Sequence, residues 1–311
     1  MADTQFITGD VFLFEHDDSC ISRLICRLSG SPISHAAMYF ENEMIIEEGL
    51  PHIGTRPVTK LGDRVVHVRR YRRSEASCKP LLAAAQKRLD AEEPYSMGNL
   101  VTVGILLVFN AWKPDARWAV KQALSALCIL LAKAIDYKKT GGKHGATCSQ
   151  LVFEMYEEAG FPLTIDRKCA ADANSEDRSL VSLAMSYDGP GPALDAVAGC
   201  PENASRDTSS FDFEKMCCVL LSVLGEQDTT ITAANTSDAL DPELYGELVR
   251  FADLLRRADC PDEAGPAANN VTDWAKRALA HLLENYSGFV TPGQLYSDCP
   301  DLDNEIAAIG S

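Results

Sequence analysis

The chain has 311 residues, a hydrophobic fraction of 46% and a formal net charge of −16. A chain of this length and composition can bury one large core or two modest ones, so disorder of the whole chain is excluded. Residues 196–311 contain 20 acidic and 7 basic residues. Because such a segment repels phosphate backbones, we expect no nucleic acid as a partner.

Cysteines are scattered along the chain, and none of the 11 forms a CxxC pair. This pattern is typical of a reducing compartment, and the first ten residues lack the basic and apolar parts of a signal peptide. We therefore expect a cytoplasmic protein. The histidines show no HExxH or similar ligand spacing, so we expect neither a metal nor another cofactor.

The N-terminal part of the chain is predicted to form an antiparallel sheet and one helix. Apolar runs and turn residues predict strands at 9–15, 33–40, 44–48 and 64–71, and a helix at 19–30 that ends at Gly30. Glu41 to Glu43 form the turn of a hairpin, and a loop containing Gly54, Pro57 and Gly62 precedes the last of these strands.

Helices follow. An Ala-rich run predicts one at 80–90, and two apolar stretches predict helices at 100–112 and 123–132. Neither stretch reaches the roughly 20 residues that cross a bilayer, so buried helices are favoured. A peripheral membrane contact through residues 99–135 is left open as an alternative.

The stretch from Thr147 to Gly160 predicts an amphipathic helix, with Thr147 as its N-cap and Gly160 as its stop. Cys148 then lies in the first turn. Unpaired N–H groups and the helix dipole stabilise a thiolate there, and the same groups can hold an oxyanion.

After residue 186 the sequence pattern changes to a linker followed by helices. The segment SYDGPGPALD is the clearest linker signal, and helices are predicted at 211–224, 242–258 and 271–286. These features predict two domains: residues 1–190, with residues 99–135 as an apolar helical insertion, and an acidic helical domain at 200–311, to which we assign no chemistry.

A cysteine nucleophile needs a base and a group that orients the base. His144 lies near Cys148 in a Gly-rich loop, whereas His35 begins a strand whose packing can fix its ring, so His35 is the preferred base. Glu47 lies across the hairpin from His35, and Glu48 has the opposite facing, so Glu47 is the preferred orienting acid. The competing interpretation is a satisfied surface histidine and a core cysteine.

Five motifs together resemble the permuted branch of the NlpC/P60 superfamily of papain-like cysteine peptidases and amidases, in which the histidine strand precedes the cysteine helix. They are GDVFLF at 9–14, SPISHAAMYF at 31–40, IIEEG at 45–49, EEPYS at 92–96 and TCSQLVFEMYEEAG at 147–160. The lecithin retinol acyltransferase group is similar in kind.

The resemblance implies an α+β, circularly permuted papain-like fold: a small antiparallel sheet packed on helices, with an added C-terminal helical region. It implies Cys148 as nucleophile, His35 as general base and acid, Glu47 as the third residue, and Tyr95 in the substrate or oxyanion pocket. The acyltransferase group commonly has His at the third position, and the insertion after Tyr95 is longer than the fold needs. Both departures bear on the substrate.

The expected function is a cysteine hydrolase, a peptidase or amidase that acts through a thioester. One alternative is a lipid-linked acyltransferase or thioesterase, and another is a non-catalytic binding protein on the same frame. The substrate would be a peptide, an amide or an acyl lipid. The sequence does not choose among these substrates, and it does not set the oligomeric state.

Overall fold

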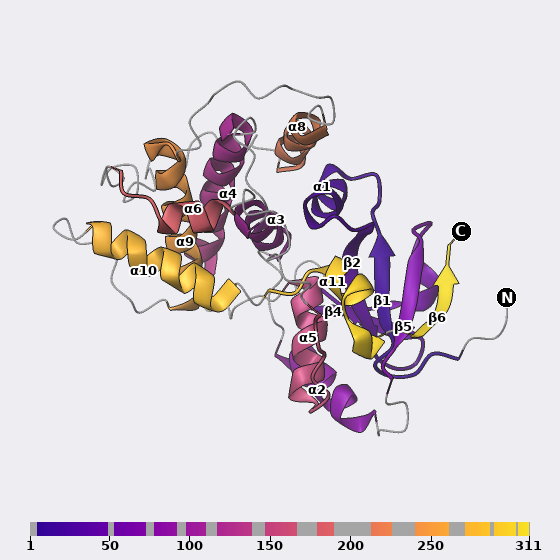
Figure 1. The fold of residues 1–311 in the computed structure, drawn as a ribbon. Helices are drawn as coiled ribbons and strands as arrows, with labels where there is room; N and C mark the ends of the chain where they lie inside the picture. Colours follow the sequence, from indigo (N-terminus) through magenta and orange to yellow (C-terminus); the bar gives the residue numbers. More distant parts are fainter. Residues whose placement is uncertain are drawn as a thin grey trace. The chain divides into compact units, whose positions relative to one another are not determined.

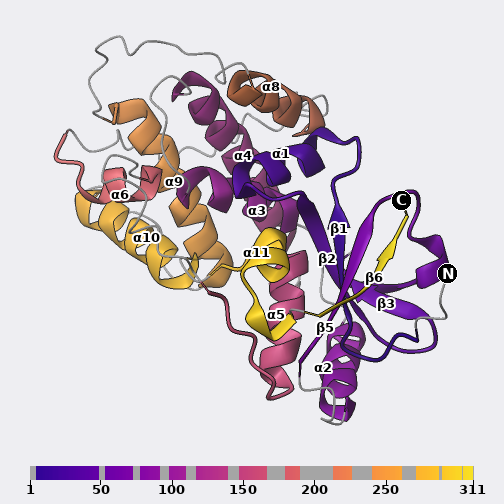
Figure 2. The ribbon, with the colours of Figure 1, turned by 45° about the vertical axis from the view of Figure 1, so that its right-hand side comes forward.

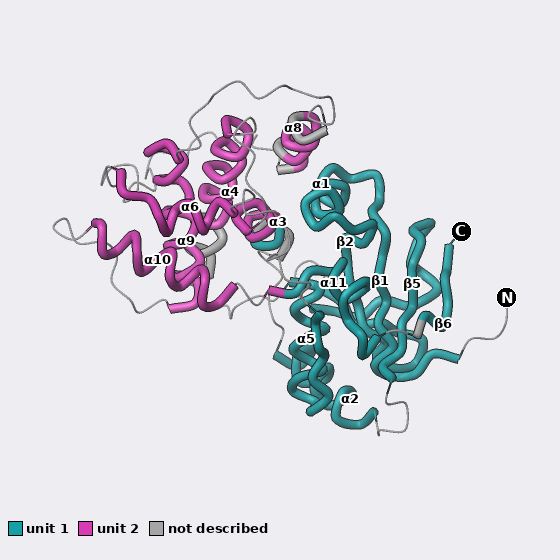
Figure 3. Tube along the Cα trace, in the orientation of Figure 1, with its two compact units in different colours: residues 1–102, 141–170, 290–311 teal, residues 103–140, 171–289 magenta. Residues whose placement is uncertain are grey.

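A computed structural model of the chain describes twelve stretches of residues (Figure 1). They are 5–48, 53–72, 78–91, 98–109, 117–138, 147–166, 179–189, 213–225, 240–260, 271–286, 289–302 and 304–310. The fold is α+β, with a six-stranded antiparallel sheet and helices. It divides into two compact units, which Figure 3 colours separately.

Unit 1 comprises residues 1–102, 141–170 and 290–311, and it contains the sheet. The strand order is β4-β3-β2-β1-β5-β6. The strands are β1 (Val11–Glu15), β2 (Ile33–Tyr39), β3 (Met44–Glu47), β4 (Gly54–Pro57), β5 (Val66–Arg70) and β6 (Asn304–Ile309).

The β2–β3 hairpin forms where the sequence predicts it. Asn42 and Glu43 both have positive φ, 50° and 60°, as the two central residues of a type I′ turn require. The register places Ala37 opposite Glu47 and Met38 opposite Ile46. His35 is therefore the diagonal neighbour of Glu47 rather than the residue directly across from it.

Helices cover one face of the sheet. Figure 1 shows α2 (Lys79–Asp90), α5 (Cys148–Glu158) and α11 (Pro292–Ser297) on this face. Their apolar side chains, including Leu81, Leu151 and Leu295, share a core with Val11, Leu13 and Met38 of the sheet. A further helix, α1 (Cys20–Ser29), contacts β2. A short 3₁₀ turn, η1 (Val58–Lys60), follows β4, and η7 (Pro300–Leu302) precedes β6.

The opposite face of the sheet carries a smaller core. Phe12, Phe14, Ala37 and Ile45 are fully buried there, with Leu61, Val66 and Val68 beside them. Because side chains alternate along a strand, β1 and β2 contribute to both cores.

Unit 2 comprises residues 103–140 and 171–289. Its helices are α4 (Arg117–Lys138), α6 (Leu180–Met185), α8 (Phe213–Gly225), α9 (Pro242–Asp259) and α10 (Val271–Tyr286), while α3 (Gly98–Phe109) contains the boundary between the units. Helix α9 packs against both α4 and α10. Asp253 accepts hydrogen bonds from Arg256 (2.8 Å) and from the Trp274 indole (3.1 Å), so this core satisfies its buried charge.

Two strands differ from the sequence prediction. Residues 54–57 were expected to be a loop but form β4, an edge strand, where the sheet tolerates Pro57 because no further strand needs its N–H. Residues 304–309, expected to belong to an acidic helical domain, form β6, which Figure 2 shows beside β5.

The predicted domain boundaries differ as well. Residues 290–311 belong to unit 1 because β6 pairs with β5, and residues 103–140 belong to unit 2, where α4 packs on α9. Each unit is thus built from separate stretches of chain rather than from 1–190 and 200–311. None of the helices that the structure describes is long and apolar enough to cross a bilayer.

Candidate active site

Cys148 is the first residue of α5, and the local sequence explains why the helix begins there. Thr147 has extended backbone angles, and its side chain accepts a hydrogen bond from the Gln150 N–H. Ser149 donates to the Val290 carbonyl at 2.7 Å, which ties the same turn to the segment before α11. Cys148 itself is buried, with only 3% of the residue exposed.

His35 lies near the start of β2, directly across from Phe14 of β1, and the two ring centroids are 5.3 Å apart. Its Nε2 lies 3.0 Å from Glu47 Oε2. The imidazole is about one-fifth exposed and the Glu47 side chain 15% exposed. A strand residue held by ring packing and one hydrogen bond keeps its ring orientation, which is what a catalytic base requires.

Glu47 at the end of β3 has a second partner that the sequence did not indicate. Arg56 on β4 approaches both carboxylate oxygens, with Nε 2.6 Å from Oε1 and Nη2 2.9 Å from Oε2. The Nη2 contact is a hydrogen bond and the Nε contact is an ion pair, and together they hold the carboxylate in place. No residue pattern indicated Arg56, because the neighbouring Gly54 and Pro57 predicted a loop.

The electrostatics couple His35 to Cys148. Burial by itself lowers the pKa of His35, but a hydrogen bond to Cys148 and the Cys148 and Glu47 charges outweigh burial and raise the pKa to about 10. Burial by itself raises the pKa of the Cys148 thiol. The His35 charge, its hydrogen bond and the N–H groups of Ala36 and Ser149 outweigh burial and lower that pKa. Both shifts favour an imidazolium beside a thiolate over a neutral imidazole beside a thiol.

A cavity of about 270 Å³ lies beside His35. Its lining combines hydroxyl groups, apolar side chains and charged groups: Asp17, Ser19, Ile21, Ser22, Ile25, Ser34, His35, Glu47, Glu48, Arg56 and Arg64. The guanidinium groups of Arg56 and Arg64 each lie over the Phe14 ring, 5.4 and 5.3 Å from its centroid. A group bound in this cavity would meet the imidazole directly.

Glu48 also belongs to this region, although sequence reasoning set it aside in favour of Glu47. It follows β3, is 6% exposed and lines the cavity. Burial and the charge of Cys148 raise the pKa of its carboxyl well above the usual value. Adjacent acids at the end of a buried strand were the signal that could have identified it.

Two residues considered from the sequence, Tyr95 and the alternative base His144, lie outside the described residues. Of the predicted site, the structure brings Cys148, His35 and Glu47 together and adds Glu48, Arg56 and Arg64 around the cavity. The roles of these side chains stay predictions.

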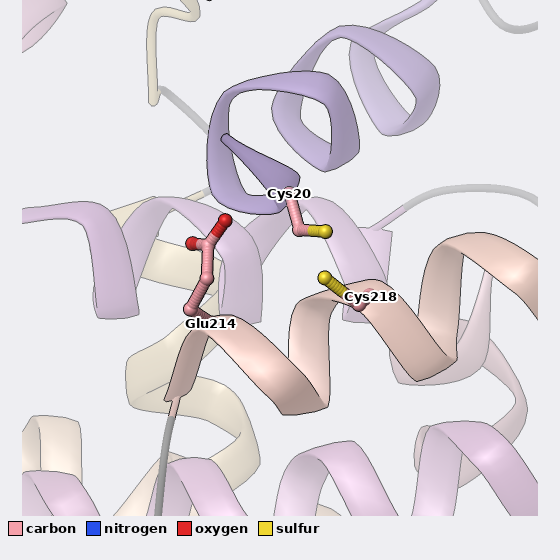
Figure 4. Close-up of side chains that lie close together, drawn as sticks. All are labelled: Cys20, Glu214 and Cys218. Atoms are coloured by element: carbon pink, nitrogen blue, oxygen red, sulfur yellow. The ribbon is translucent and has the colours of Figure 1, made fainter. Parts of the chain in front are cut away.

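A separate group of side chains is drawn in Figure 4. Glu214 and Cys218 lie one turn apart on the same face of α8. Cys20, the first residue of α1, belongs to unit 1, whereas α8 belongs to unit 2, so the three residues do not make up a site within either unit.

Compared with known protein families and with curated proteins, the sequence matches none.

Proposed function

We propose that the protein is a cysteine hydrolase that cleaves an amide or ester through a thioester intermediate. One observation carries this proposal: His35 interacts with Glu47 through Nε2 and with Cys148, which stands at the head of a helix. A nucleophile, a base and an orienting acid in this order make up the machinery of acyl transfer by a thiol.

The reaction would proceed as follows. The Cys148 thiolate attacks the carbonyl carbon, a C–S bond forms, and the C=O π pair moves to oxygen. When the tetrahedral intermediate collapses, the C–N or C–O bond breaks and the leaving group takes a proton from the His35 imidazolium. Neutral His35 then takes a proton from water, which attacks the thioester. The second collapse releases a carboxylic acid and regenerates the thiolate.

Glu47 and Arg56 support the base. Since Nε2 of His35 faces the carboxylate, Nδ1 is the nitrogen left for the sulfur. Glu47 stabilises the imidazolium, and the hydrogen bond and ion pair from Arg56 hold the carboxylate in place. Arg56 is thus a positioning residue, which acts on Cys148 only through Glu47 and His35.

The permuted papain-like arrangement belongs to the same proposal. Support comes from an antiparallel sheet whose histidine strand, β2, precedes the cysteine helix, α5, and contacts it. We also propose a cytoplasmic location, which rests on the cysteine pattern alone.

An amide or a soluble ester is the preferred substrate over an acyl lipid. The apolar side chains of α4, such as Leu124, Leu127 and Leu131, are fully buried, and α4 packs on α9. These side chains are used within the protein core, so the membrane contact considered for residues 99–135 has no support from them.

The test is site-resolved labelling with iodoacetamide at pH 7, read by mass spectrometry of the Cys148 peptide, together with hydrolysis of p-nitrophenyl acetate. Wild type is expected to alkylate fastest at Cys148 and to form an acetyl adduct there. Cys148→Ala abolishes the adduct and ester turnover, and His35→Ala slows both by about 100-fold or more.

Cys26 and Cys299 serve as internal controls in the same digest, because burial raises the pKa of each thiol to about 11. If Cys148 reacts no faster than these two, or if Cys148→Ala keeps the ester turnover, the proposed function is wrong.

A further inference from the structure

Glu48 is a buried acid for which the reaction above has no use. Its side chain lines the cavity together with His35 and Glu47, and 94% of the residue is covered, since 6% is exposed. Its Oε1 atom is buried and has no hydrogen-bond partner among the described residues. A buried polar atom without a partner is costly, so a native protein that keeps one is expected to use it.

Burial is the largest influence on the protonation of Glu48, and its charged neighbours also contribute. Cys148 and His35 both act on its carboxyl, and the thiolate is the stronger influence. The remaining ionisable groups around the cavity, Asp17, Glu47, Arg56 and Arg64, have ion-pair partners: Arg56 binds Glu47, and Arg64 Nη1 lies 3.6 Å from Asp17. Burial and the Cys148 charge outweigh the His35 charge and raise the pKa of the Glu48 carboxyl well above its usual value, which favours the neutral acid, and a neutral carboxyl has one O–H to donate.

The reaction needs such a donor. In the resting site the N–H groups of Ala36 and Ser149 act on the Cys148 sulfur and lower its pKa. The negative charge moves from sulfur to the carbonyl oxygen during attack, so a donor that faces the substrate and is not already engaged by the sulfur stabilises the transition state more than the ground state.

We propose that Glu48 is a further catalytic residue, whose carboxylic acid O–H donates a hydrogen bond to the substrate carbonyl oxygen as the Cys148 thiolate attacks. The proton stays on Glu48 throughout, so the acid is unchanged at the end of the reaction. A buried carboxylic acid kept neutral at pH 7 serves as an oxyanion donor in ketosteroid isomerase, which shows that the chemistry is available to proteins. This inference rests on the proposed function.

The test compares two reactions of Cys148. Hydrolysis of p-nitrophenyl acetate develops an oxyanion, whereas alkylation by iodoacetamide does not. Glu48→Leu is expected to lower kcat/KM for the ester by about 10- to 100-fold, while the alkylation rate stays within about twofold. Glu48→Gln keeps an N–H donor of similar shape and is expected to retain ester activity within about fivefold.

Glu41→Leu, in the turn of the same hairpin, is the control for replacing an acid by leucine and is expected to match wild type in both reactions. If Glu48→Leu does not fold, as judged by circular dichroism, Glu48→Met offers an apolar side chain of nearly the same length for the same comparison.

The possible results distinguish failure of the Glu48 inference from failure of the proposed function. Ester activity of the apolar variant equal to wild type overturns the Glu48 inference, and so does an equal loss in both reactions, because a structural role would slow both. A Gln variant as poor as the apolar one also overturns it. If wild type forms no acetyl adduct at Cys148, the proposed function fails and the inference falls with it.

Discussion

The coupling between Glu47 and Cys148 through His35 makes a quantitative prediction about the variant Glu47→Gln. The carboxylate accepts from the imidazolium at 3.0 Å and is 15% exposed, so the contact is largely shielded from solvent. A hydrogen bond to a charged group contributes about 1.5–3 kcal/mol, and a neutral one about 0.5–1.5 kcal/mol. The substitution therefore removes about 1 kcal/mol or slightly more of the stabilisation of the imidazolium.

One pKa unit corresponds to about 1.4 kcal/mol, so the pKa of His35 falls by about one unit in Glu47→Gln. The thiolate loses part of its counter-charge, and the pKa of Cys148 rises by a comparable amount. In wild type the ion pair forms as the pH rises through the lowered pKa of Cys148, and it is lost as the pH rises through the raised pKa of His35, at about 10. The substitution therefore narrows the pH range in which the ion pair exists, at its lower and at its upper end.

The assay is the rate of Cys148 alkylation by iodoacetamide from pH 4 to 9, read as the midpoint of its rise with pH. We expect the midpoint to move up by about one unit in Glu47→Gln. The matched control is Glu15→Gln, because Glu15 lies 3.0 Å from His67 Nε2 on the same sheet, and it should leave the midpoint in place. A Glu47→Gln midpoint that coincides with wild type would refute the coupling.

Three other predictions concern stability and membranes. Thr147→Ala removes the N-cap of α5 and is expected to lower the free energy of unfolding by about 1 kcal/mol in urea titrations, whereas Thr147→Ser should not. Gly9→Ala is expected to lower the free energy of unfolding by about 2–4 kcal/mol, because φ is +100° and a Cβ would lie 2.8 Å from Leu81. Gly30→Ala, where φ is +64° and no atom lies near the added Cβ, is expected to lower it by only about 1 kcal/mol. Equal losses of stability in the two variants would contradict this explanation. In vesicle flotation we expect the protein to stay with the aqueous fraction, and co-flotation with neutral lipid vesicles would revive the membrane contact through residues 99–135.

Local sequence determined much of the site. Thr147 before an apolar helical pattern fixed where α5 begins, and therefore which residue stands at its head. The turn at Asn42 and Glu43 fixed the hairpin, so the separation of His35 and Glu47 brought them within hydrogen-bond distance. These features depend on neighbours close in the chain, and residue patterns record such neighbours directly.

Tertiary structure alone decided the surroundings. Arg56 reaches Glu47 because β4 adds to the edge of β3, although its Gly and Pro indicated a loop. The C-terminal residues complete the sheet because β6 pairs with β5, which lies more than 200 residues earlier in the chain. No local sequence pattern encodes a pairing at that sequence separation. Likewise the adjacent acids Glu47 and Glu48 look equivalent in the sequence. Burial and the Cys148 charge raise the pKa of Glu48, while His35 and Arg56 lower the pKa of Glu47, and this difference exists only in the folded chain.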